Sequence, residues 1–529
     1  MVKRLACAAV CVLAASTMAY AGSVDTFGIG SRATALGGAY AATADDPFAA
    51  YYNPAGLSQI EGKVFSAGVH LIDPTIKMSD FTVTERANMS NNLIDPTSFE
   101  DESSILVAPH MGYAQKINDT FALGVAVYAP WGLELDWEKD PTKNPGSYSS
   151  YHSYYKRYGV TPTLSYKMND KLSFGVGVTI GKSEAGADTT KYLKDVGSYE
   201  VDHDGDATTD KISFSTLVNG MIQGTQGLPG NPVATNTTEA AAIYKATLES
   251  GLVTDPATVA TLTKSYQVMY ALSANPAKKY DTGADLIGVP SDMHNKTIGM
   301  ELEDDLNYSY NVGVMYKPNE TITLGLTYRS ECDADFEGDV LLDGVKSGTA
   351  TMDYNHPQQI QAGVRYQPHN KFSIECDVVW TDWSINKEQL SVLGSPMEVT
   401  VINGIPATIS EERFDRDWED TKQLRFGMEY ILNDMVTLRG GYFYDPTPIP
   451  DTTLDMQWPD ADKKTYSLGA GFNFGRYTID TVLQYTDIEQ ARHLGGESDN
   501  LNHSFQNNVV SASADGYILG AGVTLTARF

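Results

Sequence analysis

The chain has 529 residues, of which 67 are acidic and 38 are Lys or Arg, so its formal net charge at pH 7 is −29. This balance argues against a nucleic-acid partner, because nucleic-acid binding needs basic patches or stripes. Beyond the N-terminal segment there is no run of about 18 apolar residues, so we expect no membrane-spanning helix.

The first 21 residues have the organisation of a secretory signal peptide. A basic start is followed by a mostly apolar stretch, Leu5–Met18, and by a small-residue cleavage site, Ala19-Tyr20-Ala21. We therefore predict that residues 1–21 are removed and that the chain is exported. A lipoprotein anchor at Cys7 or Cys11 is the alternative, but both cysteines lie too early, inside the apolar run.

The next segment, residues 22–62, does not alternate like a strand. It is rich in Gly and Ala, as in Gly28–Tyr40, and ends with an aromatic and Asn-Pro stretch between Tyr51 and Gly56. Its apolar content favours a compact segment over a disordered leader.

Fourteen segments after residue 62 alternate, with a period of two, between apolar residues and small or polar residues. In the last one, Tyr517, Leu519, Val523 and Phe529 share one face. The segments lie near 63–72, 104–116, 120–130, 154–168, 171–183, 307–317, 321–337, 356–367, 371–384, 421–432, 435–446, 464–475, 476–488 and 516–529.

Short and long connections alternate between these segments. The short ones, such as Lys116–Asp119 and Lys317–Glu320, carry the Asn, Asp or Pro residues of hairpin turns, and the others are long and polar. This asymmetry is typical of a bacterial outer-membrane barrel. We therefore predict an all-β fold, a 14-stranded antiparallel transmembrane β-barrel over residues 63–529. The lumen of such a barrel is too wide for its own side chains to fill, so residues 22–62 are predicted to be a hatch, or plug, inside it.

The longest connection is an insertion at about 182–305, which we expect to be extracellular and partly helical. Residues 239–252 and 256–274 have helical patterns. Asp202, Asp204 and Asp206 form a weak candidate for a Ca²⁺ loop, but the full spacing and the closing Glu are missing, so a solvated acidic loop is favoured and no metal site is predicted.

Several motifs occur in a specific order: Gly37–Asp46, Asn53-Pro54-Ala55, Ala129–Leu133, Leu326–Glu331 with Asp335–Gly338, Trp380–Ser384 and Tyr444–Pro450. Together they resemble the outer-membrane long-chain fatty-acid transporter family (FadL/TodX-like), which also includes aromatic-hydrocarbon transporters. The resemblance covers essentially the whole mature chain. It implies capture of a hydrophobic ligand by outer loops, a gate in the hatch at Asn53, Pro54 and Ala55, and a kink in the third strand for sideways exit. Pro130 and Gly132 match the kink, and an ordinary strand end is the alternative.

The resemblance also implies a cation for a ligand carboxylate, near the end of the fifth strand. Lys182 is near this position but no Arg is, which leaves neutral hydrophobic ligands open. By alternation Arg157, Arg329 and Arg365 face inward, and Arg157 has four tyrosines nearby in sequence. The candidates for the head group are therefore Arg157, Lys182, Arg329 and Arg365. The alternative is that the inward arginines, Arg425 and Arg439 included, pair with Glu331, Glu375, Asp377 and Glu429.

No catalytic constellation can be assembled from the sequence, so we predict a transporter, not an enzyme, with no cofactor. The predicted ligands are long-chain fatty acids or similar hydrophobic molecules. An aromatic-hydrocarbon transporter of the same fold and an outer-membrane enzyme are the alternatives. We also expect contact with outer-membrane lipid and lipopolysaccharide, recognition by the barrel-assembly machinery through Phe529, and a monomer. The pairing of Cys332 with Cys376 stays open.

Overall fold

The structure is a computed structural model. It describes residues 28–85, 88–140, 143–190, 199–201, 210–212, 214–230, 232–273, 297–400, 406–502 and 508–529. The predicted signal peptide and the acidic residues Asp202, Asp204 and Asp206 lie outside the described residues.

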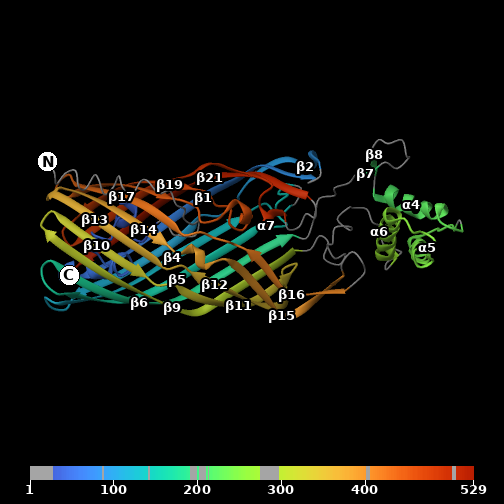
Figure 1. The fold of residues 1–529 in the computed structure, drawn as a ribbon. Coiled ribbons are helices and arrows are strands. Elements are labelled where there is room, and N and C mark those ends of the chain that lie inside the picture. Colours follow the sequence, from blue (N-terminus) through green and yellow to red (C-terminus); the bar gives the residue numbers. More distant parts are fainter. Residues whose placement is uncertain are drawn as a thin grey trace.

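Fourteen antiparallel strands close into a barrel, because the first strand pairs with the last (Figure 1). Around the wall these strands are β1 (Lys63–Glu85), β3 (Leu106–Lys116), β4 (Phe121–Asp136), β5 (His152–Lys167), β6 (Leu172–Thr190), β9 (Thr297–Asn319), β10 (Ile322–Arg329), β13 (Gln359–His369), β14 (Phe372–Thr381), β17 (Thr421–Ile431), β18 (Val436–Asp445), β19 (Lys463–Asn473), β20 (Tyr477–Gly495) and β21 (Asn508–Arg528). Each of the fourteen predicted segments coincides with one of them, which confirms the barrel.

Four of the short turns are closed by an asparagine. The side chains of Asn118, Asn169, Asn319 and Asn433 each accept hydrogen bonds from the backbone N–H groups two and three residues later. This side-chain bond replaces a ladder bond and lets the chain reverse within a few residues. The turns share one end of the barrel with the C-terminus (Figure 1).

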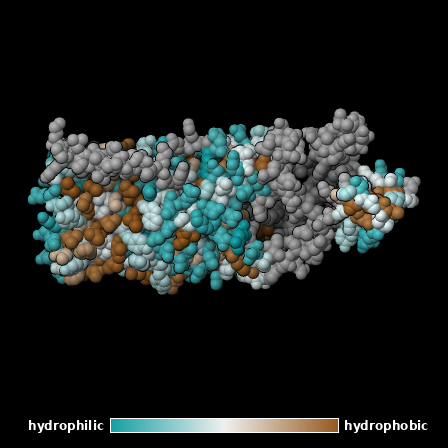
Figure 2. All heavy atoms as spheres, viewed as in Figure 1, coloured by the Kyte–Doolittle hydropathy of each residue, from teal (hydrophilic) through white to brown (hydrophobic). Residues whose placement is uncertain are grey.

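The outer face of the barrel carries an apolar belt. Aliphatic residues such as Val176, Leu326, Leu468 and Val523 are exposed on it. Figure 2 shows the hydrophobic colour gathered over the half of the barrel near the turns, with more hydrophilic surface beyond it. Since a lipid-facing barrel surface is apolar, this half is the membrane-spanning part. None of the helices in the described ranges has the length and apolarity needed to cross a bilayer.

The wall continues beyond the belt as longer strands and added hairpins that the sequence did not predict. They are β2 (Asn88–Glu100), β11 (Cys332–Leu342), β12 (Val345–His356), β15 (Glu388–Thr400) and β16 (Pro406–Asp415). The prediction of one strand over 321–337 was wrong, because β10 ends at Arg329 and β11 begins at Cys332. A period of two continues across such a break, so alternation alone cannot locate it.

Residues 28–62 lie in the lumen and are called the hatch segment below. They form α2 (Ser31–Ala35), α3 (Ala49–Tyr52) and η2 (Pro54–Gln59), and their apolar side chains are nearly all buried. The segment's backbone lies directly on inward glycines of the wall. A Cβ atom added to Gly325 would lie 2.0 Å from the Ala41 oxygen, and one added to Gly175 would lie 2.2 Å from the Pro54 carbonyl carbon. Glycine at these positions is what allows so close an approach.

The insertion between β6 and β9 contains a helical module, α4 (Phe214–Gly224), α5 (Thr237–Glu249) and α6 (Pro256–Ser273). Tyr244, Leu262 and Met269 are buried in a core made by the module itself. Figure 1 shows the module beyond the end of the barrel that is opposite to the C-terminus. The outer parts of β6 and β9 reach further into the predicted 182–305 insertion than expected, to Thr190 and from Thr297.

Candidate functional site

A pocket lies in the lumen between the hatch segment and the outer part of the barrel. Its lining comprises Tyr51 of the hatch segment and wall residues Tyr128, Pro130, Trp131, Arg157, Thr179, Ser309, Tyr310, Asn311, Arg329, Ser330, His356, Pro357 and Gln359. The lining thus combines aromatic and neutral polar side chains with two cations. Its free volume is about 30 Å³, which is room for one or two water molecules. A long ligand therefore needs a lining group to move.

Arg157 on β5 is buried in this pocket, with only 4% of its surface exposed. Its Nε donates to Asn307 Oδ1 at 3.0 Å and its Nη2 donates to Ser309 Oγ at 3.1 Å. Both acceptors are neutral and lie on β9. In the described part of the chain no carboxylate forms an ion pair with Arg157, so its positive charge is uncompensated by direct contact.

Arg329 on β10 lies in the same pocket. It donates to Gln359 Oε1 at 2.9 Å, to Gln361 Oε1 at 3.2 Å and to the Tyr51 carbonyl at 3.3 Å. Its guanidinium carbon lies 4.6 Å from the centre of the Tyr51 ring, a cation–π contact. Among the described residues Arg329 likewise has no carboxylate partner.

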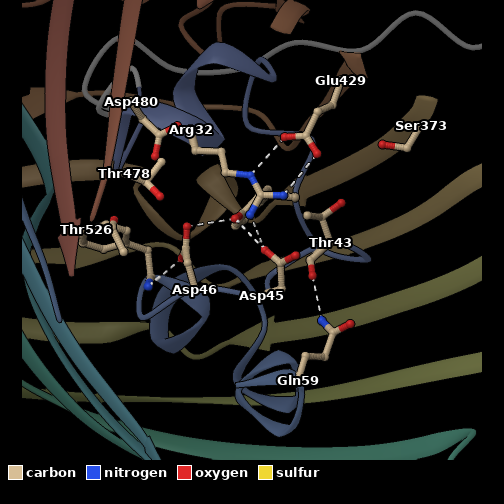
Figure 3. Close-up of polar contacts among 12 residues, drawn as sticks. Arg32, Thr43, Asp45, Asp46, Gln59, Ser373, Glu429, Thr478, Asp480 and Thr526 are labelled. Carbon is tan, nitrogen blue, oxygen red and sulfur yellow. Dashed lines mark hydrogen bonds and ion pairs between the residues drawn. The ribbon is translucent and has the colours of Figure 1, made fainter. Parts of the chain in front are cut away.

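Two other lumen arginines are neutralised by acidic residues. Arg439 pairs with Glu429 and Asp480, and Arg32 of the hatch segment pairs with Asp45 and Glu429 (Figure 3). Of the expected salt-bridge network, the Arg439–Glu429 pair is present. Within the pocket lining, the contrast marks Arg157 and Arg329 as cations that remain available to an anionic ligand.

The other two head-group candidates lie elsewhere. Lys182 is partly exposed on the outer face of β6 and pairs with Glu303 and Asp305. Arg365 donates to Ser373 Oγ at 3.4 Å and does not line the pocket. The structure therefore brings Arg157 and Arg329 together but not Lys182 or Arg365. Lys182 does not reach the pocket, because the residue before it, Gly181, is the one that faces inward.

Six aromatic side chains cover the pocket on its outer side, and we call them the aromatic ring. The centroid distances around it are 5.5 Å for Trp131–Trp383, 5.4 Å for Trp383–Trp418, 6.2 Å for Trp418–Trp458, 6.1 Å for Trp458–Tyr155, 5.3 Å for Tyr155–His356 and 6.3 Å for His356–Trp131. The six residues come from separate strands and loops and are all at least nine-tenths buried. Burial, with the Arg157 cation nearby, lowers the pKa of His356 well below its usual range, so this imidazole is neutral near pH 7.

The wall beside the pocket has a window between β3 and β4. β3 pairs with β1 as far as Leu106, but its pairing with β4 stops at Met111, opposite Val127. Pairing of the wall resumes only where the Glu102 N–H donates to the Asp136 carbonyl at 2.7 Å. In this described stretch the residues Leu106–His110 have no ladder partner on β4.

The third-strand irregularity coincides with one of the two predicted residues. The register between β4 and β5 skips from Tyr128 to Trp131, so a bulge includes Pro130. Gly132, in contrast, pairs regularly with Lys156, and the expectation of a kink there was wrong. Pro130 and Trp131 also line the pocket, so the pocket adjoins the window.

The predicted gate residues tie the hatch segment to itself and to the wall. Asn53 Nδ2 donates to the Ala41 carbonyl at 2.7 Å and to the Val314 carbonyl at 3.1 Å, and Asn53 Oδ1 accepts from the Ala55 N–H at 3.1 Å. Pro54 starts η2, and the Ala55 carbonyl accepts from Ser165 and Ser173 of the wall. Their role as a gate stays a prediction.

Of the residues that line the pocket, the sequence named Pro130, Arg157 and Arg329 as site residues, and those it missed include Tyr51, Asn311 and His356. Tyr51 lay in a segment without periodicity, and His356 falls at the break before β13, where alternation carries no information. Asn311 sits on an inward face of β9 and could have been found by its period. Cys332 and Cys376 are not joined by a disulfide, and no cluster of three possible metal ligands occurs in the described part of the chain.

The chain is similar to known proteins over almost its entire length. Residues 10–529 match the family model described as "Outer membrane protein transport protein (OMPP1/FadL/TodX)". The chain is 25% identical to outer membrane protein P1 of Haemophilus influenzae over 467 residues, which cover 83% of this chain and 80% of that protein. It is 22% identical to the long-chain fatty acid transport protein of Escherichia coli K12, covering 85% of this chain and 84% of that protein.

Solved structures share the fold. A FadL homologue of Pseudomonas aeruginosa superposes with a TM-score of 0.64 at 18% identity, covering 97% of this chain and 100% of that chain. The toluene transporter TbuX of Ralstonia pickettii gives a TM-score of 0.56 at 17% identity, covering 95% of this chain and 98% of that chain. The barrel, its apolar belt and the family match together show that the chain belongs to the OMPP1/FadL/TodX family of outer-membrane proteins, which transport hydrophobic substrates and are not enzymes.

Proposed function

We propose that this outer-membrane transporter carries long-chain fatty acids, and that their carboxylates bind Arg157 and Arg329. The observation that carries the proposal is the pair of lumen arginines, Arg157 buried and Arg329 half-buried, whose bonding groups, in the described residues, are all neutral. Buried charges are normally paired, so such a pair favours an anionic ligand. Relatives named long-chain fatty acid transport proteins support the same ligand class.

The route that we propose leads from the outer loops past the aromatic ring to the pocket, and from the pocket sideways through the window between β3 and β4. The acyl chain gains about 0.8 kcal/mol for each buried CH₂, so an apolar passage suffices to hold it. Exit through the window delivers the chain into the bilayer, and not into water. The hatch segment, with Asn53, Pro54 and Ala55, acts as the gate on this route.

An aromatic hydrocarbon is the second candidate ligand. The aromatic ring favours it, because flat ligands can stack on or edge against indole and phenol groups. Toluene transporters are also among the proteins with the same fold. A neutral arene, however, makes no use of Arg157 and Arg329.

The test compares oleate with oleyl alcohol, which has the same chain and no carboxylate. Hydrogen bonds to charged groups contribute about 1.5–3 kcal/mol, so Arg157→Gln and Arg329→Gln are each expected to weaken oleate binding by roughly 10- to 100-fold. The affinity for oleyl alcohol should change less than about twofold, because its neutral hydroxyl forms no ion pair with either arginine. Equilibrium binding of both radiolabelled ligands, corrected for protein-free micelles, measures this.

Lys182→Gln is the matched control, because it removes a cation from the outer face of the same barrel. It should leave oleate binding unchanged. Equal loss in Lys182→Gln and Arg157→Gln would show a general charge effect and contradict the proposed head-group site. Binding of toluene without binding of oleate would establish the second candidate in place of the first.

A further inference from the structure

Arg157 is held by Asn307, a buried residue of β9 that does not line the pocket. Asn307 Oδ1 accepts from Arg157 Nε at 3.0 Å, and Asn307 Nδ2 donates to Ser183 Oγ at 3.0 Å and to Asp304 Oδ2 at 3.1 Å. A reversed amide would set its N–H groups against the N–H of Arg157, so these partners determine which end of the amide faces the arginine. The groups therefore follow one another in the order arginine, amide, carboxylate.

The same order of groups occurs at Arg329. Its Nη2 donates to Gln361 Oε1 at 3.2 Å, and Gln361 Nε2 donates to Asp377 Oδ2 at 2.7 Å and to the Gly38 carbonyl at 3.1 Å. Gln361 is fully buried and likewise lies outside the pocket lining. At both arginines an amide side chain thus separates the guanidinium from a carboxylate.

We propose that Asn307 and Gln361 determine the selectivity of the pocket for anionic ligands, as positioning residues that orient the two arginines and leave their charge to the ligand. This inference rests on the proposed function. An amide oxygen accepts a hydrogen bond without bringing a negative charge, whereas a carboxylate in the same place would form an ion pair with the guanidinium. Such an ion pair would compensate the charge that a ligand carboxylate needs. Elsewhere in the lumen, Glu429 forms this kind of pair with Arg439.

The hydrogen bonds of Arg157 leave one edge of its guanidinium open. A guanidinium has five N–H donors in a planar fork. The Nε donor and one Nη2 donor, which bond to Asn307 and Ser309, lie side by side on one edge. Nη1 forms no hydrogen bond with any of the described residues. The edge made by Nη1 and the second Nη2 hydrogen can therefore bind a ligand carboxylate through two parallel hydrogen bonds.

A bulge in β9 brings Asp304 and Asn307 together. Residues three apart in a regular strand face opposite sides of the sheet. Here Gly181 and Ser183, which are two apart on β6, pair with Asn307 and Asp304, which are three apart on β9. The additional residue brings both side chains to one face, where they form their hydrogen bond. The bulge thus supplies the carboxylate that orients the Asn307 amide.

Exchanging the amide and the carboxylate tests the inference without changing the composition or the net charge of the protein. In the Asp304→Asn/Asn307→Asp double variant, the carboxylate lies against Arg157 and the amide lies behind it. We expect oleate binding to weaken by roughly 10- to 100-fold, as in Arg157→Gln, because an internal ion pair takes the place of the ligand carboxylate. The affinity for oleyl alcohol should change less than about twofold.

Oleylamine gives a readout that a general loss of structure cannot produce. Its ammonium group meets two uncompensated cations in the wild-type pocket, and the exchange neutralises one of them. Oleylamine should therefore bind the double variant more tightly, by about fivefold or more, because a repulsion between like charges is removed. Equilibrium binding of the three radiolabelled ligands, corrected for protein-free micelles, measures these changes.

The Gln361→Glu/Asp377→Asn double variant makes the same exchange at Arg329 and tests the second arginine independently. It should have the same effects on the three ligands.

Asn319→Asp is the control for both exchange variants, because it replaces an amide with an acid at the far end of β9. At this turn either side chain can accept the hydrogen bonds from the N–H groups of Thr321 and Ile322. The control should leave the binding of all three ligands unchanged.

The outcomes separate the inference from the proposed function. If Arg157→Gln weakens oleate binding but both exchange variants bind oleate like the wild type, the inference is refuted and the head-group assignment stands. Equal loss of oleate and oleyl alcohol in the exchange variants, without tighter binding of oleylamine, would show a purely structural role and would also refute it. If the wild-type protein does not bind oleate, the proposed function fails, and the inference fails with it.

Discussion

Asp46 is a residue of the hatch segment whose charge depends on its packing. It accepts hydrogen bonds from the Tyr40 hydroxyl and from the Phe48 N–H, both at 2.8 Å. Burial raises its pKa to about 6, although the nearby Arg32 cation acts in the opposite direction. The protonated acid is therefore the form that the folded hatch segment favours.

We expect the hatch segment to be more firmly packed in mild acid. A carboxyl group whose pKa is raised on folding adds stability that is complete below its unfolded pKa, near 4, and is lost as the pH rises through about 6. Exchange at residues 40–52, corrected for intrinsic rates, should therefore be slower at pH 5 than at pH 8. Asp46→Asn keeps the side chain neutral and should show the pH 5 protection at both values. A variant with the same pH dependence as the wild type would assign the effect to another group.

The sequence predicted single site residues unevenly. Alternation correctly placed Arg157 and Arg329 on the lumen face, because the period of two determines which side chains face inward. Their role as a head-group site stays a prediction. Lys182 was misplaced by one residue, and one residue reverses the face of a strand. The contact of Arg329 with the Tyr51 carbonyl was not accessible, because the two residues are 278 positions apart in the chain.

At the scale of strands, the window between β3 and β4 has a direct consequence for transport. Ala108 is half-buried in the stretch of β3 that lacks a partner on β4. A bulky side chain there occupies the opening without touching Arg157 or Arg329. Binding and exit can therefore be separated by one substitution.

Ala108→Trp is expected to lower uptake of labelled oleate at least about tenfold in cells without their own transporter, because the larger side chain blocks exit. Oleate binding by the purified protein should stay within about twofold of the wild-type value, because the charged head-group contacts are unchanged. Ala362→Trp, on the lipid-facing side of β13, is the control and should transport normally. Normal uptake by Ala108→Trp would exclude the window as the exit.

The elements that the sequence predicted best are those that a single periodicity determines. All fourteen wall strands alternate because one face meets lipid and the other meets the lumen. The outer hairpin of β15 and β16 was missed, because both of its faces are outside the membrane and no such constraint acts on them. The bulge at Pro130 was indicated by the missing backbone donor of proline. The window is defined by the pairing of β1, β3 and β4, so the sequence of any one of these strands could not predict it.

At the scale of the molecule, the helical module and the barrel are built as separate units. Thr190 and Thr297 are paired, so β6 and β9 already form a hairpin below the insertion. The module's buried side chains, such as Leu262 and Met269, pack within it. The barrel therefore does not depend on the module for its closure.

Replacing residues 191–296 with a four-residue Gly-Ser turn should leave the barrel folded. Its thermal midpoint should shift by no more than about 4 °C, which corresponds to a change of roughly 1–2 kcal/mol in the free energy of unfolding of a large domain. Circular dichroism melting in detergent measures this. The helical signal should disappear and the β signal should remain. Loss of the folded barrel would show that the module contributes to its closure.

The glycines under the hatch segment determine how that segment can move. Where its backbone lies on Gly175, Gly325 and Gly441, no side chain of the wall projects between hatch residues. Interlocked side chains would resist sliding, because each would have to leave its rotamer before the surfaces could shift. We therefore expect that, once its hydrogen bonds are released, the hatch segment can shift along this glycine surface without a rearrangement of wall side chains.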